Sequence, residues 1–224
     1  MDKKRYIRAM FDSIVPTYDF LNRVLSCGID TLWRKDLVKS ISKSPSKKIL
    51  DVCCGTGDLS RYFIKIKAEL FSLDFSFNML KKGISKGWLS GGNISGDAAK
   101  LPFKDREFDF LTIAFGIRNI PDVDSFLLES LRVLKPDGKL LILELTRPEN
   151  RFIGFLYRLY LTKIIPFIGG IVSGKRAAYR YLAGSIETFL DREKLTDRIK
   201  ISGFKSVEYK IKTFGIATIY ICSK

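Results

Sequence analysis

The sequence predicts an α/β fold whose sheet is mostly parallel, with helices on both faces and an antiparallel hairpin at the C-terminal end. Apolar runs of strand length alternate with amphipathic helical stretches between residues 47 and 146, which is the pattern of βαβ units. The chain then ends in two β-rich runs with no helix between them. Its 224 residues, 46% of them hydrophobic, can bury a sizeable core. This length suits one α/β domain or two small ones, and we expect residues 1–224 to form a single domain.

The elements follow in order along the chain. The expected strands lie at residues 47–53, 68–76, 92–98, 108–116 and 138–146, the third being short. The helical stretches are residues 58–66, 77–87, 122–135 and 192–204. Glycine, proline and aspartate bound these runs, as they do at element ends. Residues 204–224 read as two strands joined around Phe214 and Gly215, which predicts the hairpin that closes the sheet.

Two segments lie outside this alternation. Residues 1–46 look helical and are expected to cover the site, and residues 149–190 form an apolar helical insertion. Within the insertion, Arg158 and Lys163 interrupt the most apolar run, and Pro166 with Gly169-Gly170 is expected to break the helix. Charges at the centre of a membrane span are costly. The insertion is therefore predicted to form a lid or wall of an apolar substrate channel, or to lie in a membrane interface.

Charge and cysteine content narrow the possible partners. The formal net charge is +15, which suits nucleic acid, an anionic membrane surface or an acidic substrate, unless it is only a lysine-rich solvated surface. The four cysteines lack CxxC spacing, so we expect reduced thiols, a cytoplasmic protein and no metal site. The N-terminus lacks the unbroken apolar core of a signal peptide. With no histidine in the chain, proton transfer falls to carboxylates, tyrosine, lysine, an unusual arginine or water.

A glycine turn follows the first expected strand, in "CCGTGDLS". Gly55 and Gly57 permit positive φ and a close approach of a ligand to the backbone, and helix amides beyond them point toward that ligand. A dinucleotide fingerprint requires a third glycine where Ser60 stands, so a pyrophosphate site has little support.

Three carboxylates accompany the turn. Asp51 lies at its base, Asp74 ends the second strand 17 residues after Gly57, and Asp97 ends the third strand. A carboxylate at the position of Asp74 accepts the ribose hydroxyls of an adenosine. Carboxylates without a lysine or arginine suit a cationic, phosphate-free nucleoside such as S-adenosylmethionine. The alternative is that all of these residues are ordinary strand-end turn residues.

Several quoted stretches together resemble a known family. The order "LDVCCGTGDLS", "LDFSFNML", "GDAAKLPF", "FDFLTIAFGIRNIPD" and "LRVLKPDGKLLILEL" is similar to class I S-adenosylmethionine-dependent methyltransferases, which implies a Rossmann-like sheet of seven strands. The segments "MFDSIVPTYDFLNRVLSCGIDTLWRK" and "IIPFIGGIVSGKRAAYRYLAGSIETF" extend the resemblance to the C-methyltransferases of ubiquinone and menaquinone biosynthesis. The chain departs from that family's usual residues at Cys53, where a glycine is common in methyltransferases, at Ala114, where a serine is frequent, and at Leu190, where the family tends to have a proline.

The resemblance implies roles for individual residues. Asp74 would bind the ribose of S-adenosylmethionine, and Asp97 with Ala98 the adenine edge. The full set expected at this donor site is Asp51, Gly55, Thr56, Gly57, Asp74, Asp97, Ala98 and Ala114. The catalytic residues would be Arg118, as a phenolate stabiliser, with Asn119 and Tyr18 as orienting hydrogen-bonders and water carrying the proton out. Otherwise, Arg118 would be a strand-end salt bridge and Tyr18 a core residue.

The implied reaction is C-methylation of a polyprenylated quinol, demethylmenaquinol or the equivalent benzoquinol of the ubiquinone pathway. Phe152, Phe155, Tyr157, Tyr160 and Ile164 would wall the channel for the prenyl tail, with the helix around residues 178–189 as a second wall. Expected partners are the quinol and an anionic membrane surface at the inner face of the cell membrane, with a possible homodimer and no nucleic acid. A nucleic-acid methyltransferase and a non-catalytic membrane-associated protein on the same fold are the alternatives.

Overall fold

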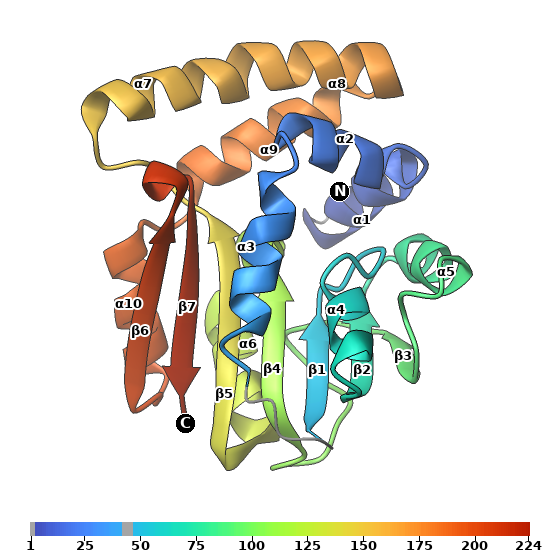
Figure 1. Ribbon diagram of the computed structural model, residues 1–224, viewed down its shortest axis with the longest axis vertical. Helices are drawn as coiled ribbons and strands as arrows, with labels where there is room; N and C mark the ends of the chain where they lie inside the picture. Colours follow the sequence, from blue (N-terminus) through green and yellow to red (C-terminus); the bar gives the residue numbers. More distant parts are fainter. Residues whose placement is uncertain (1–2, 42–46) are drawn as a thin grey trace.

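The computed structural model describes residues 3–41 and 47–224 (Figure 1). Residues 1–2 and 42–46 of the expected N-terminal segment fall outside the described part. Across the described residues, seven strands form one sheet in the order β3-β2-β1-β4-β5-β7-β6. The strands are β1 (Lys48–Val52), β2 (Glu69–Asp74), β3 (Gly92–Ser95), β4 (Phe108–Ala114), β5 (Leu134–Leu145), β6 (Ser206–Lys212) and β7 (Ala217–Ser223).

The strand pairing confirms the predicted mixed sheet. Strands β1 to β5 pair in parallel, whereas β7 pairs antiparallel with both β5 and β6. The predicted hairpin therefore closes the sheet, with its turn in the 3₁₀ segment η3 (Thr213–Gly215). Strand order reverses between β1 and β4, and ligands of open α/β sheets bind at such a switch point.

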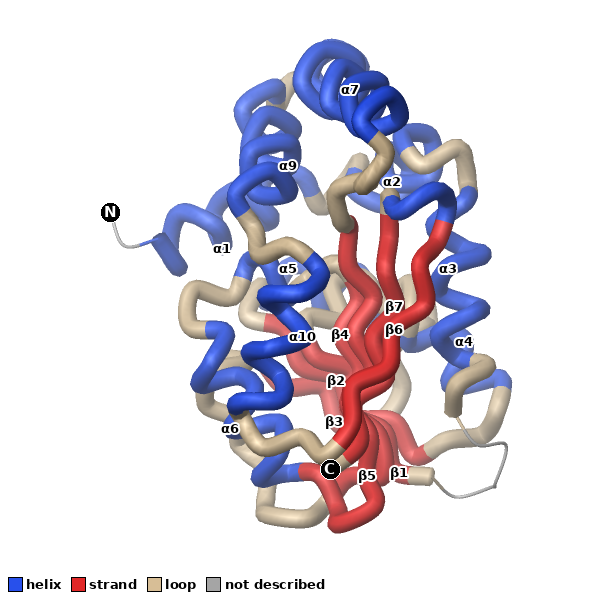
Figure 2. The backbone as a smooth tube through the Cα atoms, turned by 90° about the vertical axis from the view of Figure 1, so that its left-hand side faces the viewer, coloured by secondary structure: helices blue, strands red, loops and turns tan. Residues whose placement is uncertain are grey.

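Helices cover both faces of the sheet. The helices of the core and the N-terminal segment are α1 (Lys3–Ile14), α2 (Tyr18–Leu25), α3 (Ile29–Val38), α4 (Ser60–Lys65), α5 (Phe77–Ser85), the 3₁₀ turn η1 (Ile117–Asn119), α6 (Val123–Val133) and α10 (Arg192–Ile201). Figure 2 shows α6 and α10 on one side of the sheet, with α3 and α4 on the other. Phe126 of α6 and Ile199 of α10 are fully buried in one core, and Leu37 of α3 and Phe63 of α4 in the other. Because β1, β4 and β5 are buried on both faces, they read as continuous apolar runs in the sequence.

Short polar side chains set where several helices begin. Ser76 accepts a hydrogen bond from the Met79 amide at the start of α5, and Asp122 accepts one from the Ser125 amide at the start of α6. Asp191 caps α10 in the same way. These caps satisfy amides that have no partner within the helix. They also fix the register of each helix against the strand ends.

The insertion crosses the carboxyl ends of the strands. It consists of α7 (Arg151–Leu159), the π-helical turn η2 (Tyr160–Ile164), α8 (Ile165–Ser173) and α9 (Arg176–Thr188). Figure 1 shows α7 and α8 along one end of the molecule, with α9 and α2 beneath them. Together with α1 and α2, these helices form a third hydrophobic core that lies above the sheet.

The expected helix break at Pro166 and Gly169-Gly170 is wrong, because Arg151–Ser173 is one helix of 23 residues. The π-helical turn directly before Pro166 changes the hydrogen-bond pattern where proline has no amide to donate. Gly169 is needed for packing, since a Cβ there would lie 2.4 Å from the Tyr179 ring of α9. By length and composition alone, this helix is long and apolar enough to cross a membrane.

Candidate active site

Two cavities meet above the switch point of the sheet. The first, the strand-end cleft, has a volume of about 80 Å³ and lies at the carboxyl ends of β1, β2 and β4. The second, the aromatic cavity, has a volume of about 250 Å³ and lies between the N-terminal helices and the insertion. Four residues line both cavities, namely Phe11, Tyr18, Phe115 and Asn119. Groups bound in the two cavities would therefore meet at these side chains.

The strand-end cleft contains most of the residues predicted for the donor site. Gly55, Asp74, Asp97, Ala98 and Ala114 line it, together with Tyr18 and Asn119. Lining residues that the sequence did not single out include Lys4, Phe75 and Met79. The cleft combines two carboxylates with mostly apolar walls, which suits a ligand with hydroxyls, a flat ring and positive charge.

Asp74 is fixed by backbone amides at the end of β2. Its carboxylate accepts hydrogen bonds from the amides of Gly55 and Ser76, both at 2.8 Å, and the residue is 8% exposed. Burial raises the pKa of Asp74 to about 6, although these amides oppose the rise. Gly55 has φ +57°, a conformation that suits glycine. Each carboxylate oxygen retains acceptor capacity for a ligand hydroxyl.

Asp97 is less buried and already paired. Lys4 of α1 donates to it at 2.6 Å, and the Ala99 amide donates at 3.0 Å. Burial alone would raise the pKa of Asp97, but these two donors lower it below its usual value. Helix α1 thus contacts the cleft through Lys4.

The structure does not place three predicted donor-site residues on the cleft wall. Asp51 lies beneath the turn, where it accepts hydrogen bonds from Ser60 and Thr112, and burial raises its pKa to about 6. Gly57 has φ +84°, and a Cβ there would lie 2.8 Å from Leu89. The Thr56 hydroxyl donates to Asp19 of α2. The side chains of Asp51 and Thr56 and the backbone of Gly57 shape and anchor the turn.

Cys53 occupies a backbone position that favours glycine. Its φ is +54°, in the left-handed region. A Cβ on Gly116 would lie 2.6 Å from the Cys53 Cβ, so the absence of a side chain at Gly116 makes room for the cysteine. The departure at Cys53 is therefore accommodated by its neighbour.

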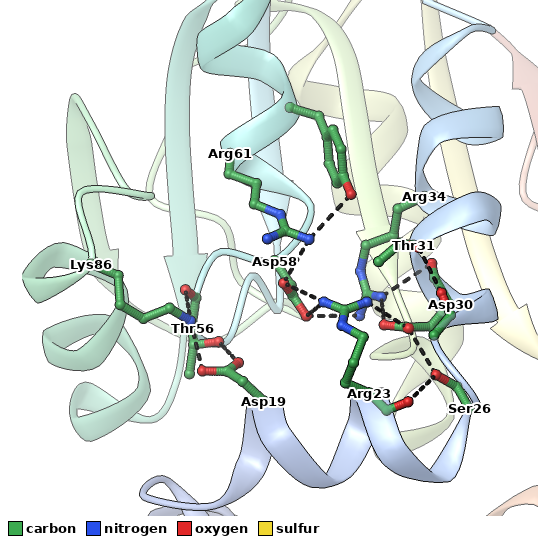
Figure 3. Close-up of polar contacts among 12 residues, drawn as sticks. Asp19, Arg23, Ser26, Asp30, Thr31, Arg34, Thr56, Asp58, Arg61 and Lys86 are labelled. Atoms are coloured by element: carbon green, nitrogen blue, oxygen red, sulfur yellow. Dashed lines mark hydrogen bonds and ion pairs between the residues drawn. The ribbon is translucent and has the colours of Figure 1, made fainter.

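An ionic network holds the glycine turn against the N-terminal helices (Figure 3). Asp58, which directly follows Gly57, lies 3.4 Å from Arg23 and 3.7 Å from Arg34. Both arginines also pair with the buried Asp30 at the start of α3. On the other side of the turn, Lys86 donates to Asp19 at 2.7 Å, next to the Thr56 hydroxyl. This network places α2 at the edge of both cavities.

Aromatic and aliphatic side chains from distant segments line the aromatic cavity. They include Met10, Ile14, Leu25 and Trp33 from the N-terminal segment, and Tyr157, Tyr160, Leu161, Ile165, Ala178, Tyr179, Tyr181 and Leu182 from the insertion. Tyr157, Tyr160 and helix α9, which were predicted to wall a channel for the prenyl tail, thus line this cavity, and the channel itself stays a prediction. Phe152, Phe155 and Ile164 are instead exposed on the outer face of the insertion, so their assignment to the channel is wrong. The helix presents its tyrosines inward and these residues outward.

Arg118 lies on this cavity, at the end of β4. Its Nη1 donates to Glu144 Oε1 at 2.5 Å and to the Phe115 carbonyl at 2.7 Å, and its Nε donates to Ser185 at 3.3 Å. Glu144 is completely buried, so the pair is a buried salt bridge at the strand end. Within the part of the chain that the structure describes, Nη2 of Arg118 makes no hydrogen bond or ion pair. One edge of the guanidinium is therefore left for a ligand oxygen.

Asn119 and Tyr18 lie beside Arg118. Asn119 donates to the Phe115 carbonyl at 3.4 Å and accepts from the Tyr181 hydroxyl at 3.1 Å. Burial raises the pKa of the Tyr18 hydroxyl, while a hydrogen bond with Asn22 and the nearby Arg34 and Arg118 oppose the rise. Tyr18 is therefore a neutral hydroxyl at physiological pH.

Sequence reasoning missed Glu144, Tyr181, Ser185 and Lys4. Only Glu144 carried a signal, as a single carboxylate within the apolar run "LLILEL". A buried charge requires a partner, which here is Arg118. Within residues 3–41 and 47–224, no group of three or more histidine, cysteine, aspartate or glutamate residues could hold a metal ion.

Comparisons with known proteins agree with this geometry. The chain is 44% identical over 223 residues to a demethylmenaquinone methyltransferase of Thermotoga maritima, covering 97% of this chain and 96% of that protein. It is 35% identical to a mitochondrial 2-methoxy-6-polyprenyl-1,4-benzoquinol methylase of Dictyostelium discoideum, covering 98% of this chain and 81% of that protein.

Solved structures support the fold. A crystal structure of an S-adenosylmethionine-dependent methyltransferase from Thermotoga maritima superposes with a TM-score of 0.68 at 19% identity, covering 96% of this chain and 99% of that one. The fold is therefore that of class I S-adenosylmethionine-dependent methyltransferases. A model of the ubiE/COQ5 methyltransferase family matches residues 1–224, and the chain belongs to this family.

Proposed function

We propose that this protein transfers a methyl group from S-adenosylmethionine to a ring carbon of a polyprenylated quinol. The acceptor is demethylmenaquinol, the equivalent benzoquinol of the ubiquinone pathway, or both. The observation that carries the proposal is the junction of two unlike cavities, which share Phe11, Tyr18, Phe115 and Asn119. The names of the relatives support the same substrate class.

The strand-end cleft fits the donor. Asp74 accepts the two ribose hydroxyls, and Asp97 with Ala98 lies at the adenine edge. When bound, S-adenosylmethionine supplies a methyl group that is already activated on a cationic sulfur. The carboxylate of Asp74 favours that positive charge, whereas the charge of Asp97 is balanced by Lys4. The residues of the chain therefore need only hold, orient and dehydrate the reactants.

The aromatic cavity fits the acceptor ring. A quinol ring carbon becomes nucleophilic when the neighbouring hydroxyl loses its proton, and phenols titrate near 10. The free edge of Arg118 stabilises the phenolate oxygen, while Asn119 and the neutral Tyr18 hydroxyl orient the ring. Glu144 holds Arg118 in place but also weakens its net positive charge.

The methyl group moves from sulfur to the ring carbon in a single displacement. The ring carbon bonds to the methyl carbon as the sulfur–methyl bond breaks, and neutral S-adenosylhomocysteine leaves. The methylated ring carbon then loses its proton, which restores an aromatic phenolate, and this oxygen takes up a proton to give the quinol, so that one proton is released overall. The chain has no histidine, and we propose that water carries the released proton out. The prenyl tail lies along the apolar walls, where each buried CH₂ contributes about 0.8 kcal/mol.

Activity assays test this function directly. Purified protein with a radiolabelled methyl donor should label demethylmenaquinol or its benzoquinol equivalent, and should leave RNA unlabelled. Mass spectrometry of the quinone pool in cells that lack the gene should show a species lighter by one methyl group. Labelling of RNA, or an unchanged quinone pool, would contradict the proposal.

We also propose that the protein works at the inner face of the cell membrane as a peripheral, cytoplasmic enzyme. The outer face of helix 151–173 exposes Phe152, Phe155, Leu156, Leu159, Ile164, Phe167, Ile171 and Val172. The insertion helices, residues 151–188, carry six basic residues and one acidic residue, Glu187, which pairs with Arg158 at 2.9 Å. An apolar face flanked by positive charge suits the surface of an anionic bilayer.

Vesicle binding separates this proposal from a homodimer through the same face. Binding to anionic vesicles should exceed binding to neutral ones at low salt and fall as salt rises. Phe155→Asp with Phe167→Asp should abolish it. Equal binding to both vesicle types, or a stable dimer that buries this face and binds no vesicles, would contradict membrane contact.

A further inference from the structure

Helix α9 presents two hydroxyl groups to the turn that carries Arg118 and Asn119. Tyr181 and Ser185 lie one helical turn apart and therefore on the same face of α9. The Tyr181 hydroxyl donates to Asn119 Oδ1 at 3.1 Å, and the Ser185 hydroxyl accepts from Arg118 Nε at 3.3 Å. Ser185 in turn donates to the Leu182 carbonyl at 2.8 Å, which fixes the direction of its lone pairs.

The opposite face of α9 is held in a packed core. Tyr179, Ala183 and Ile186 are buried there. Gly169 of α8 packs against the Tyr179 ring closely enough that a Cβ would lie 2.4 Å from it. Because close-packed interiors yield little, α9 can serve as a rigid support for the two hydroxyls.

The hydrogen bonds with Tyr181 and Ser185 add to those that already orient the side chains of Arg118 and Asn119. Arg118 is held at Nη1 by Glu144 and the Phe115 carbonyl, and at Nε by Ser185. Asn119 is held at Nδ2 by the same carbonyl and at Oδ1 by Tyr181. With these edges occupied, the guanidinium plane and the carboxamide plane are both fixed.

The side chains of Arg118 and Tyr181 lie between the aromatic cavity and a second, more open cavity. Arg118 and Tyr181 line the aromatic cavity on one side. They also line a more open cavity of about 420 Å³ on the other side, where Ser185, Lys3 and Arg198 are found. Ser185 does not line the aromatic cavity, so its effect on a ligand there must pass through Arg118. A small rotation of Arg118 toward the open cavity would remove its free edge from the acceptor.

We infer that Tyr181 and Ser185 are positioning residues for methyl transfer, which hold Asn119 and Arg118 in the orientation that the acceptor oxygen requires. This inference rests on the proposed function. Catalysis depends on such orientation, since misplacement by about 1 Å can cost a hundredfold in rate. Nothing in the sequence pattern pointed to these two hydroxyls, because the contacts join segments more than 60 residues apart.

Single-hydroxyl variants test the inference. Ser185→Ala and Tyr181→Phe should each lower kcat about 5- to 10-fold, the typical worth of one hydrogen bond. KM for the quinol and the affinity for S-adenosylmethionine should stay within about twofold of the wild-type values. The reason is that the walls of the aromatic cavity and of the strand-end cleft keep their shape. Ser185→Thr keeps the hydroxyl and should restore most of kcat.

Thr188→Ala is the matched control. Thr188 lies on the same helix, and its hydroxyl donates only to the Gly184 carbonyl one turn earlier. Its removal should leave kcat at the wild-type value. If Thr188→Ala lowers kcat as much as Ser185→Ala does, the effect comes from helix stability and the inference is wrong.

The pH profile of kcat provides a second readout. If Ser185 acts through the phenolate-stabilising edge of Arg118, the limb of kcat that rises with pH should move to higher pH in Ser185→Ala. A merely structural role would lower kcat equally at every pH. Folded Ser185→Ala and Tyr181→Phe proteins with wild-type kcat and profile would overturn the inference. If wild-type protein methylates no quinol, the proposed function itself fails, which is a different result.

Discussion

The strand-end cleft and the aromatic cavity are neighbours, but they are built in different ways. The cleft is formed mainly at the ends of parallel strands, within residues 53–121. Its key carboxylate, Asp74, is held by two backbone amides. The aromatic cavity joins helices from residues 10–34 to helices from residues 157–182. Its contacts across that gap include the Tyr160 hydroxyl, which donates to the Leu25 carbonyl at 2.7 Å.

In the proposed function, this difference separates recognition of the donor from recognition of the acceptor. Strand register fixes the cleft, so a donor site of this kind follows from the fold. Side-chain contacts between distant helices fix the aromatic cavity, so acceptor choice can change while the sheet stays the same. Variants on the two sides should therefore affect donor affinity and turnover separately.

The largest effect is expected at Arg118. Arg118→Lys should lower kcat about 100- to 1,000-fold, as the loss of a preorganised donor to a developing oxyanion does. The lysine keeps a positive charge beside the buried Glu144, so the fold is preserved, whereas Arg118→Ala would leave that carboxylate unpaired. Affinity for S-adenosylmethionine, measured by calorimetry, should stay within a few fold. Near-normal turnover of a quinol by Arg118→Lys would exclude the role of Arg118.

Asp74→Asn should produce the opposite pattern. Loss of a charged acceptor for the ribose should weaken S-adenosylmethionine binding about 10- to 100-fold. At a saturating donor concentration, kcat should remain close to wild type. Asp109→Asn is a suitable control, since Asp109 pairs with Lys47 and Lys135 at the other end of the sheet. Wild-type donor affinity in folded Asp74→Asn would show that the cleft is not the donor site.

Donor binding should weaken in mild acid. Because burial raises the pKa of Asp74 to about 6 in the free protein, the carboxylate is protonated below that pH. A cationic donor favours the ionised form, so its affinity should fall by up to about tenfold per pH unit below 6. Calorimetry between pH 5 and 8 should also detect proton release on binding.

The same group should shift stability in the other direction. The unfolded pKa of an aspartate is about 3.9, so the folded state takes up protons between roughly pH 4 and 6. The contribution of Asp74 to the free energy of unfolding should therefore rise as the pH falls through this window.

For the donor-binding prediction, an affinity for S-adenosylmethionine that is constant from pH 5 to 8 would contradict a role for the buried carboxylate of Asp74.

The smallest effect is expected at the link between α2 and the glycine turn. Asp19→Asn removes the ion pair with Lys86 and should lower the free energy of unfolding by about 1 kcal/mol. Since α2 borders the aromatic cavity, KM for the quinol should rise about threefold while kcat changes little. Lys39→Met removes an exposed ion pair with Asp36 and should change neither quantity. An unchanged KM in Asp19→Asn would show that the docking of α2 does not tune acceptor binding.

The fold and most residues of the strand-end cleft could be predicted because their signals are local. Strand alternation predicted the sheet, and the turn with Asp74 and Asp97 lies at successive strand ends. The contacts around the aromatic cavity could not be derived in this way. The Glu144 partner of Arg118 and the hydroxyls of Tyr181 and Ser185 depend on tertiary packing. The continuity of the helix through Pro166 depends on a π-helical turn that the sequence pattern did not indicate.

The most direct test is a crystal structure with S-adenosylhomocysteine and a short-tailed quinol analogue bound together. The ribose should lie on Asp74 in the strand-end cleft, and the quinol ring should fill the aromatic cavity with one oxygen on Arg118. Sulfur and ring carbon should then face each other beside Tyr18 and Asn119. A ring bound instead in the open cavity near Lys3 and Arg198, or a sulfur that points away from the aromatic cavity, would contradict the two-cavity mechanism.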